Sequence, residues 1–274
     1  MKRVENIDKD LKKRILELLY RDEIYNAILI ELIEKYQDDL GELYIGEGNN
    51  EVTDILHIKS DGNSDFTSFC SNRENGLENI ALQIKKLTYE KILLAGRLKD
   101  IKALLDKLGV KKDITPNNFY RLNIDKYRDL DLEYNSEVRV AKLNDEDIKK
   151  TKNFTIDFFE AETEEEIEEV SDTEKIIDKI KKGVYLLQYK DETIGMARFI
   201  GETNNFAEIT SVYIDHKYRN QGFGKQLIGH MIDVSIRKGK VPVLVTSSTN
   251  FPAKKTYETM GFERYGDYAY EFIN

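Results

Sequence analysis

The stretch YRNQGFGKQL, residues 218–227, constrains the fold more than any other part of the chain. It places two closely spaced glycines between an alternating apolar segment, EITSVYI at 208–214, and an amphipathic segment that begins at Phe223. Alternation predicts a strand and three- to four-residue spacing predicts a helix, so the glycines lie at a strand-to-helix turn. Such a turn directs backbone N–H groups and the positive end of the helix at one point, where a phosphate is stabilised.

Charges beside the glycines favour an anion site over a bare turn. Arg219 and Lys225 bracket Gly222 and Gly224, and a pair of cations suits a pyrophosphate. Neither the GxxxxGK[ST] loop of nucleotide-binding proteins nor the GxGxxG dinucleotide fingerprint is present. A plain strand-to-helix turn is the alternative, because short glycine motifs are common.

The net charge of −9 argues against a general attraction to nucleic acid or to an anionic membrane. We therefore expect no nucleic-acid partner and no membrane partner, and any phosphate must be bound locally. The single cysteine, Cys70, excludes an internal disulfide and a cysteine-based zinc cluster, which favours the cytoplasm. The first residues meet charge at once and lack an apolar signal core, so we expect an unexported protein.

Two series of strands and helices follow one another along the 274 residues. A hydrophilic segment at 126–137 separates them, which predicts a first domain at 1–130 and a second at 137–274, both of mixed α/β structure. The first series comprises two helices or one interrupted helix within 8–39, strands at 42–46, 52–59 and 65–70, a helix at 76–87, a strand at 91–96, a helix at 98–109 and a strand at 119–125.

The second series begins with a strand at 138–143 and helices at 145–159 and 172–182. A hairpin at 184–189 and 193–200 turns at the sequence KDE, and the strand at 208–214 comes next. The remaining elements are the helix that begins at 223, a strand at 241–245, a helix at 252–261 and two closing strands at 262–266 and 269–273.

The glycine turn resembles the acetyl-coenzyme A site of the GNAT superfamily of N-acetyltransferases. That family carries the signature [R/Q]xxGx[G/A] after its fourth strand, and Arg219, Gly222 and Gly224 fill it. A second family motif is matched by NFPAKKTYETMGF, through its asparagine, alanine, tyrosine and closing Gly-Phe at 250, 253, 257, 261 and 262. The resemblance covers residues 137–274 and implies a GNAT acyl-CoA N-acyltransferase fold there, preceded by a smaller or degenerate GNAT-like α/β domain.

The resemblance also implies how acetyl-CoA binds as a cosubstrate. The edge of the strand at Val212, Tyr213 and Ile214 would pair with the pantetheine amides, and the Val212 N–H would stabilise the thioester oxygen. The turn at 219–225 would hold the pyrophosphate. The expected cofactor contacts are Val212, Tyr213, Ile214, Arg219, Asn220, Gln221, Gly222, Phe223, Gly224, Lys225, Asn250, Ala253 and Tyr257.

Two residues are candidates for proton transfer. An alkyl ammonium has a pKa of about 10.4, so a base must remove a proton before the amine attacks. Glu208 precedes Arg219 by eleven residues, the spacing of the catalytic glutamate in the histone-acetyltransferase branch of the superfamily. Tyr257 would protonate the departing thiolate, as the family's tyrosine often does. The plain alternatives are a surface or salt-bridging carboxylate for Glu208 and core packing for Tyr257.

The function implied is an acetyl-CoA-dependent N-acetyltransferase, in which a primary amine attacks directly within a ternary complex. A non-catalytic acyl-CoA-binding or regulatory module is the alternative. No metal is expected, because His57, His216 and His230 are isolated and lack ligand spacing. The segment TSSTN at 246–250 is interpreted as the end of a strand followed by a helix cap, and Asn250 is also an expected cofactor contact.

The run EAETEEEIEEV places seven glutamates between 160 and 169. In GNAT proteins the loop between the first two helices often lies there, beside the acceptor entrance. The run is either a solvated acidic face or an attraction for a cationic acceptor, such as a polyamine, an aminoglycoside or a lysine side chain. The acceptor is thus a small-molecule or peptide amine, and the sequence leaves the oligomeric state open.

The first half reads as a degenerate copy of the second. ALLDKLGV echoes KKTYETMGF, and TSFCSNRENGLE echoes TSVYIDHKYRNQGFG. Leu105 stands where the second half has Tyr257, and Glu78 replaces the second glycine in a shorter turn at Gly76. Chance is the alternative, because helix–glycine–strand endings are common in α/β proteins. A true repeat predicts two GNAT-like lobes with one active site.

Overall fold

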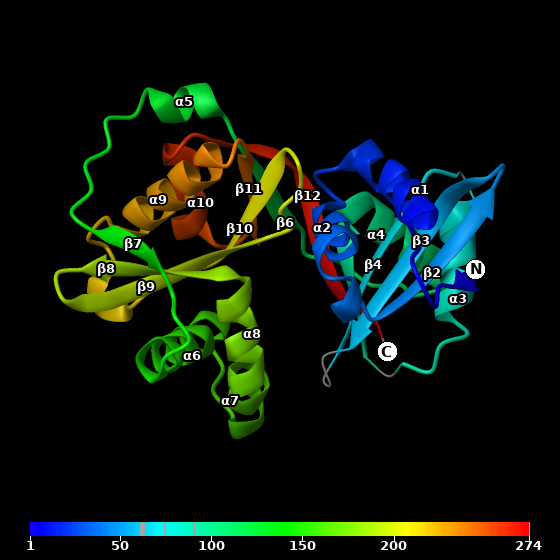
Figure 1. Cartoon of the computed structure of the whole chain (residues 1–274), viewed down its shortest axis with the longest axis horizontal. Helices are drawn as coiled ribbons and strands as arrows, with labels where there is room; N and C mark the ends of the chain where they lie inside the picture. The colour runs from blue at the N-terminus through cyan, green and yellow to red at the C-terminus, as the bar shows by residue number, and fades with distance from the viewer. Residues whose placement is uncertain (61–63, 74, 90, 274) are drawn as a thin grey trace.

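The computed structural model of the chain describes residues 1–60, 64–73, 75–89 and 91–273. Its strands form one 12-stranded sheet, against which the helices pack in two lobes (Figure 1). The elements of the first half are β1 (Lys2–Arg3), α1 (Lys9–Leu19), η1 (Tyr20–Asp22), α2 (Ala27–Lys35), η2 (Gln37–Asp39), β2 (Glu42–Gly48), β3 (Glu51–Ser60), β4 (Asp65–Ser71), α3 (Gly76–Ile84), β5 (Ile92–Arg97), α4 (Leu98–Leu108), β6 (Asn117–Leu122) and α5 (Ile124–Arg128).

The second half supplies the other lobe. Its elements are β7 (Glu137–Val140), α6 (Asp145–Phe159), α7 (Glu164–Ser171), α8 (Thr173–Gly183), β8 (Val184–Tyr189), β9 (Glu192–Ile200), β10 (Phe206–Ile214), η3 (His216–Tyr218), α9 (Phe223–Arg237), β11 (Val241–Ser247), α10 (Phe251–Thr259) and β12 (Phe262–Ile273).

The sheet has the same order when it is followed from either edge. Its strands run β1-β2-β3-β4-β5-β12-β6-β11-β10-β9-β8-β7. Each strand from β1 to β6 therefore matches the strand six numbers later, from β7 to β12. Among the described ladders, β4–β5 and its counterpart β10–β11 are the parallel pairs. The repeat suggested by the sequence is thus present in the fold, although residue 74 of the first echo lies outside the described residues.

The last strand of each half crosses into the other half. Strand β6 follows α4 along the chain but pairs with β11 and β12. Strand β12 pairs with β6 near its start and with β5 from Tyr268 to Ile273. The two halves of the chain therefore share one continuous sheet, although the hydrophilic segment at 126–137 separates them in the sequence. The domain limits of 1–130 and 137–274 stay a sequence prediction.

Three sequence-based expectations need correction. The strand expected at 119–125 ends at Leu122, because the side chain of Asn123 accepts a hydrogen bond from the Lys126 N–H and caps α5. The two closing strands are a single strand, β12, whose register shifts between Arg264 and Gly266. The acidic segment expected as a loop contains the helix α7, which Thr163 and Glu166 begin with a reciprocal capping box.

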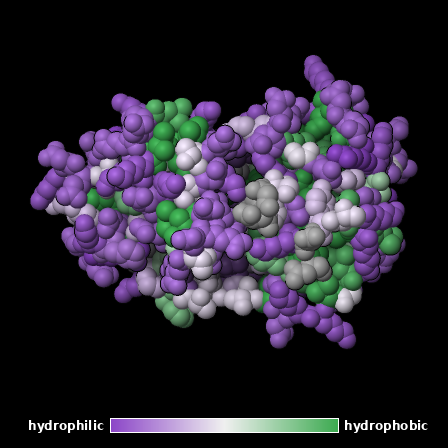
Figure 2. Space-filling model, turned by 90° about the horizontal axis from the view of Figure 1, so that it is seen from below, coloured by the Kyte–Doolittle hydropathy of each residue, from purple (hydrophilic) through white to green (hydrophobic). Residues whose placement is uncertain are grey.

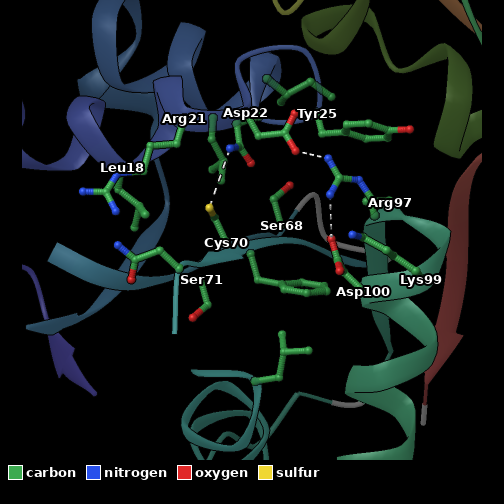
Figure 3. Close-up of a pocket in the computed structure, with 18 of the residues that line it drawn as sticks. Leu18, Arg21, Asp22, Tyr25, Ser68, Cys70, Ser71, Arg97, Lys99 and Asp100 are labelled. Carbon is green, nitrogen blue, oxygen red and sulfur yellow. Dashed lines mark hydrogen bonds and ion pairs between the residues drawn. The ribbon is translucent and has the colours of Figure 1, made fainter. Parts of the chain in front are cut away.

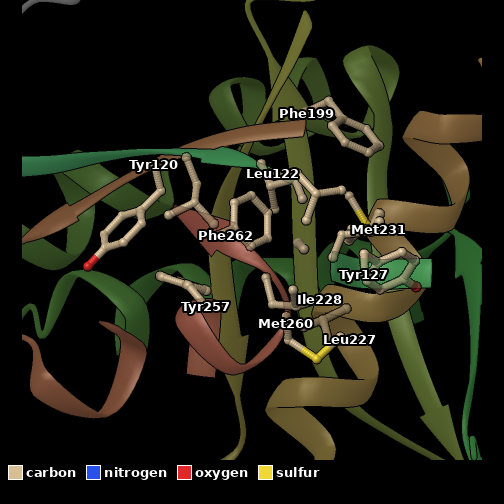
Figure 4. Close-up of a cluster of buried hydrophobic side chains, with 14 of the residues drawn as sticks. Tyr120, Leu122, Tyr127, Phe199, Leu227, Ile228, Met231, Tyr257, Met260 and Phe262 are labelled. Atoms are coloured by element: carbon tan, nitrogen blue, oxygen red, sulfur yellow. The ribbon is translucent and has the colours of Figure 1, made fainter. Parts of the chain in front are cut away.

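Apolar side chains fill the space on both faces of the second half of the sheet. Under α9 and α10, Leu227, Ile228 and Met231 pack against Phe262 in the main cluster (Figure 4). On the opposite face, α6 and α8 cover a smaller cluster that includes Met196. The apolar spacing of α9 explains its position, since the residues three and four apart share the buried face.

The outer surface is mostly hydrophilic, with apolar residues in small separate patches on the face seen in Figure 2. None of the helices in the described part of the chain has the length and apolar character needed to cross a membrane.

Candidate functional site

Strand β10 bends away from regular pairing at the place where the cosubstrate is expected. It pairs in parallel with β11 over Phe206–Glu208. Its antiparallel ladder with β9 shifts register between Thr210 and Tyr213, and Ser211 inside this bulge has a φ of 53°. A bulge leaves backbone groups outside the ladder, and the described pairing with β11 ends at Glu208. This part of β10 is therefore suited to pair with an extended ligand.

The three residues expected to pair with pantetheine follow the bulge directly. Val212 and Ile214 are partly buried and pack against the cluster under α9. Tyr213 is buried, and its hydroxyl donates a hydrogen bond to Asp157 Oδ2 at 2.8 Å. Because the Tyr213 ring is held against α6, its contribution to a ligand on the strand edge would come from its backbone.

The turn between β10 and α9 is held in shape by its own side chains. Arg219 Nε donates to the Ile214 carbonyl at 3.0 Å, and its guanidinium lies 5.4 Å from the centre of the Tyr213 ring. Gln221 Nε2 donates to the Lys217 carbonyl at 2.9 Å. Asn220 and Lys225 are exposed. The two cations thus stand at the turn, with Arg219 fixed and Lys225 open to solvent.

The start of α9 is open. Gly222 is the N-cap residue, with a φ of 86°, and no side chain caps the helix. A methyl group added at Gly222 or Gly224 would meet no described atom within 4 Å. The first N–H groups of a 15-residue helix therefore face free space beside two cations, which fits a pyrophosphate. The Phe223 side chain is buried, so its expected contact with the cosubstrate falls to its backbone N–H.

Helix α10 holds the residues of the second motif. The Asn250 side chain accepts a hydrogen bond from the Ala253 N–H at 3.2 Å and caps the helix, as its sequence position predicts. Tyr257 is buried, with ring centres of Tyr120 and Phe262 at 6.4 and 6.0 Å. Burial raises the pKa of Tyr257 to about 12, so its hydroxyl keeps its proton at neutral pH.

Glu208 is neither a surface carboxylate nor part of a salt bridge among the described residues. It is 7% exposed, and none of the described hydrogen bonds or ion pairs involves its carboxylate. Burial raises the pKa of Glu208 to about 7, although the charge of Arg198 acts in the opposite direction. A carboxylate with this pKa accepts a proton and releases it again near neutral pH, as a general base requires.

Glu208 shares a face of the sheet with Arg198. Its neighbours Ala207 and Ile209 point into the cluster under α9, so Glu208 lies on the opposite face. Arg198 stands opposite Thr210, two residues from Glu208 on the same face. Arg198 was missed in the sequence, where the signal was one charged residue at an apolar position of the alternating strand TIGMARFI.

A cavity lies in the first half, beside the strands β4 and β5, which correspond to β10 and β11 of the second half. It has a volume of about 310 Å³ and extends between α2, β4, β5 and α4 (Figure 3). Arg97 dominates it: the guanidinium pairs with Asp22, lies 3.9 Å from Asp100 and sits 4.1 Å from the centre of the Tyr25 ring. These pairs satisfy the charge of Arg97 inside the protein.

The turn at the start of α3 differs from that at α9. Asp54 is fully buried there, accepts a hydrogen bond from Ser71 Oγ at 2.7 Å and is paired with Arg73. Glu78, which replaces the second glycine, is paired with Lys107 at 2.6 Å. Buried Asp54 gives this turn a negative charge where a phosphate would have to lie, and nothing in the sequence pattern had singled it out.

The histidines make separate contacts. His57 Nε2 lies 2.5 Å from the Leu40 carbonyl oxygen, and His230 Nε2 lies 2.9 Å from that of Ser136. His216 packs its ring 6.1 Å from that of Tyr213. Within residues 1–60, 64–73, 75–89 and 91–273, no group of three or more His, Cys, Asp or Glu side chains is placed to hold a metal ion.

The glutamate run lies at the outside of the second lobe. Glu164, Glu165 and Glu166 begin α7 and are exposed. Glu166 accepts backbone hydrogen bonds from residues 162 and 163 at 3.0 Å, which lowers its pKa. One of the three carboxylates therefore stabilises the helix start.

Comparison with known proteins agrees with this geometry. Residues 150–262 match the model of the acetyltransferase (GNAT) family. No curated protein matches the sequence significantly. A GNAT-family acetyltransferase of Colwellia psychrerythraea has a similar structure, with a TM-score of 0.63, 16% identity and 99% of each chain covered. A tandem GNAT protein from the clavulanic acid biosynthesis pathway has a TM-score of 0.68 at 10% identity, over 99% of this chain and 98% of that one. The chain thus has the fold of tandem GNAT proteins, and its residues 150–262 match the model of the GNAT acetyltransferase family.

Proposed function

We propose that the protein transfers the acetyl group of acetyl-CoA to a primary amine, by direct attack of the amine within a ternary complex. One observation carries the proposal: β10 joins a buried carboxylate with a raised pKa, Glu208, to the open start of α9. The family's chemistry needs a base and a phosphate site on the same strand and turn. The single cysteine also supports a place in the cytoplasm.

Different parts of the site would bind different parts of acetyl-CoA. The N–H groups at the start of α9, with Arg219 and Lys225, bind the pyrophosphate. The backbone of 212–214 pairs with the pantetheine amides, and the Val212 N–H donates a hydrogen bond to the carbonyl oxygen of the thioester. Bound acetyl-CoA supplies the activated acetyl group.

Glu208 would accept a proton from the acceptor amine, and Tyr257 would assist the departure of the thiolate. The acceptor arrives as an ammonium ion, and Glu208 takes its proton so that the nitrogen lone pair is free to attack. As the new C–N bond forms and the C–S bond breaks, the nitrogen gives up its second proton and the sulfur takes one up, with the Tyr257 hydroxyl donating a hydrogen bond to the leaving sulfur. The amide product no longer carries the ammonium charge.

The test is release of free coenzyme A thiol from acetyl-CoA in the presence of a panel of primary amines. An acetyltransferase releases thiol only when a suitable amine is present, and Glu208→Gln should reduce that release while acetyl-CoA still binds in calorimetry. Binding without turnover across a broad panel would identify an acyl-CoA-binding module instead. Absence of binding would contradict the site itself.

A further inference from the structure

A small cavity lies beside the bulge of β10, on the same face of the sheet as Glu208. It is enclosed by α6, α8 and β9, has a volume of about 30 Å³, and includes Ser211 of the bulge in its wall. One water molecule needs at least about 10–15 Å³ measured in this way, so the cavity holds a group of only a few atoms. It is too small for a whole substrate and fits one functional group of it.

Two cations line this cavity. Arg198 is partly buried, and its described hydrogen bond runs from Nε to Ser211 Oγ at 3.3 Å. Lys179 is partly buried as well, and its described contact is with the Phe159 ring, whose centre lies 5.9 Å from Nζ. Neither cation forms an ion pair in the described part of the chain. Burial, followed by the charge of Arg198, lowers the pKa of Lys179 to about 8.

The carboxylates near Arg198 and Lys179 either pair with other groups or are only partly ionised. Asp178 is paired with Lys182 at 2.8 Å. Glu31 accepts a hydrogen bond from the Gly201 N–H at 2.7 Å and pairs with Lys35. Burial raises the pKa of Glu208 to about 7, so this carboxylate is only partly ionised near neutral pH. The cavity consequently carries an excess of positive charge.

A third donor in the cavity has no acceptor. Thr151 is 1% exposed and lines the cavity, and its Oγ1 has no hydrogen-bond partner among the described residues. By contrast, Thr155 Oγ1, one helical turn later, donates to the Thr151 carbonyl at 2.7 Å. A buried hydroxyl without a hydrogen-bond partner is destabilising, so a ligand that supplies an acceptor would be favoured here.

We propose that this cavity binds a carboxylate of the acceptor through Arg198, Lys179 and Thr151, so that the acceptor is a small amino acid. The inference rests on the proposed function and specifies its substrate class. A carboxylate accepts hydrogen bonds from all three groups and neutralises the two cations. Its planar shape and few atoms fit the volume of the cavity.

The position of the cavity sets the distance between the two ends of the acceptor. Ser211 belongs both to the cavity wall and to the bulge where the thioester would lie. A carboxylate bound here places an amine a few bonds away near the thioester and on the face that carries Glu208. Phe158 and Phe159, which are 37% and 55% exposed, stand at the cavity and offer contact to an apolar side chain.

This substrate class differs from the cationic acceptor that the glutamate run suggested. The glutamates are exposed on α7, whereas the two cations line the cavity at the bulge. A polyamine would bring a further positive charge close to Arg198 and Lys179. A lysine side chain would bring no negative charge to pair with these two cations. The two readings therefore predict opposite preferences.

The experiment compares amines that differ only in the carboxylate. Acetylation rates are measured for L-alanine against ethylamine and for L-phenylalanine against phenethylamine, with spermidine and 1-aminoethylphosphonate as further arms. We expect kcat/KM to be at least about 10-fold higher for each amino acid than for its decarboxylated partner, because hydrogen bonds to charged groups contribute about 1.5–3 kcal/mol. A higher rate with the phosphonate would replace the carboxylate by a phosphate-type group and overturn the assignment.

Variants locate the effect in the cavity. Arg198→Met and Lys179→Met should each lower the preference for the amino acid over its decarboxylated partner about 10- to 100-fold, through a higher KM for the amino acid, with the KM for acetyl-CoA nearly unchanged. Arg198 also lowers the pKa of Glu208, and the ratio of the two kcat/KM values removes this effect because both amines share it. Arg198→Lys should restore part of the loss. Lys181→Met is the matched control, because Lys181 is exposed on the same helix α8. Equal effects on both members of a pair would show that Arg198 is structural and would overturn the proposal.

Failure of this inference is separable from failure of the proposed function. If decarboxylated amines or spermidine are acetylated as well as the amino acids, the enzyme stands and the amino-acid assignment is wrong. If no amine is acetylated, calorimetric titration of the protein with L-alanine and L-phenylalanine in the presence of coenzyme A decides. A binding heat in the native protein that is lost in Arg198→Met supports the cavity as a carboxylate site. Absence of a binding heat in the native protein overturns the proposal.

Discussion

Gly222 and Gly76 begin equivalent helices in the two halves of the chain, but only Gly222 has free space beside it in the described structure. A methyl group at Gly222 would meet no atom within 4 Å, whereas one at Gly76 would overlap Ser71 Oγ and a carboxylate oxygen of Asp54. The first half has therefore filled its helix start with side chains, one of them an acidic group. Among the described residues, an open helix start of the kind that suits a phosphate is therefore seen in the second half.

This difference predicts one acetyl-CoA per chain. Calorimetric titration should give a stoichiometry near one, and Gly224→Glu should abolish the binding, because it places a carboxylate at the open turn. A stoichiometry near two would show that the cavity beside Arg97 also accepts the cosubstrate. In that case the binding that survives Gly224→Glu would belong to the first half.

Gly224→Ala should separate stability from binding. Gly224 lies in the first turn of α9 with an ordinary negative φ and open space around it, so alanine fits without strain. Alanine in a helix is favoured over glycine by roughly 0.5–1 kcal/mol, so the free energy of unfolding should rise slightly. The family signature accepts alanine at this position, so acetyl-CoA affinity should stay nearly unchanged.

The matched control is Gly222→Ala. At a φ of 86° alanine is strained by roughly 1–2 kcal/mol, so this variant should lose both stability and affinity. Thermal unfolding and calorimetry on the two variants provide the comparison. Unchanged affinity in Gly222→Ala would mean that the pyrophosphate does not approach the start of α9.

The pKa of Glu208 predicts how the rate depends on pH. A base works in its ionised form, and burial raises the pKa of Glu208 to about 7. The value of kcat/KM should therefore rise from pH 6 to pH 8, with its midpoint near 7. Glu208→Gln should lower the rate about 100-fold or more and remove this rise, since positioned base catalysis contributes roughly 10²- to 10⁴-fold. A variant that keeps the same midpoint would assign the titration to another group.

Buried His57 predicts a loss of stability in mild acid. Burial lowers the pKa of His57 to about 4, whereas the unfolded chain takes up the proton near 6.5. Because the unfolded state binds the proton first, the free energy of unfolding should fall as the pH drops from 6.5 towards 4, by about 3 kcal/mol from this residue. Chemical denaturation at several pH values measures the slope. His57→Gln retains a donor for the Leu40 carbonyl and should show a flatter dependence over that interval.

Local sequence signals predicted most elements of the fold. The apolar spacing of α9 and the alternation of β8 are strong enough to locate both elements, and β8 was placed at residues 184–189 as observed. The exchange of β6 and β12 could not be predicted, because alternation shows that a strand exists and not which strand lies beside it. The bulge at Arg264–Gly266, which lets β12 serve both halves, likewise follows from pairing across the sheet.

The site was predictable where the chemistry lies in a contiguous motif. The glycine turn and the Asn250 cap are local, and the structure forms both. Arg198 and Thr151 come from a strand and a helix 47 positions apart, and their common cavity arises only when α6 packs over β9. Asp54 was overlooked for the same reason, since its hydrogen-bond partner Ser71 lies on the next strand.

Tyr257→Phe tests whether the tyrosine acts in catalysis or only packs in the core. Phenylalanine keeps the ring, which contacts Tyr120 and Phe262, and removes the hydroxyl alone, so stability should change little. Burial raises the pKa of Tyr257 to about 12, whereas a free thiol has a pKa of about 8.5. Full proton transfer to the thiolate is therefore unfavourable, and the hydroxyl would stabilise the leaving sulfur mainly by its hydrogen bond.

We accordingly expect kcat to fall roughly 10- to 100-fold in Tyr257→Phe, at the low end of positioned acid catalysis, with acetyl-CoA affinity nearly unchanged. Single-turnover measurements should confirm that the chemical step is the one slowed. A donor of lower thiol pKa should also reduce the difference between the variant and the native protein, because a better leaving group needs less help. Native kcat in the variant, with chemistry rate-limiting, would leave Tyr257 as a packing residue and assign the proton to solvent.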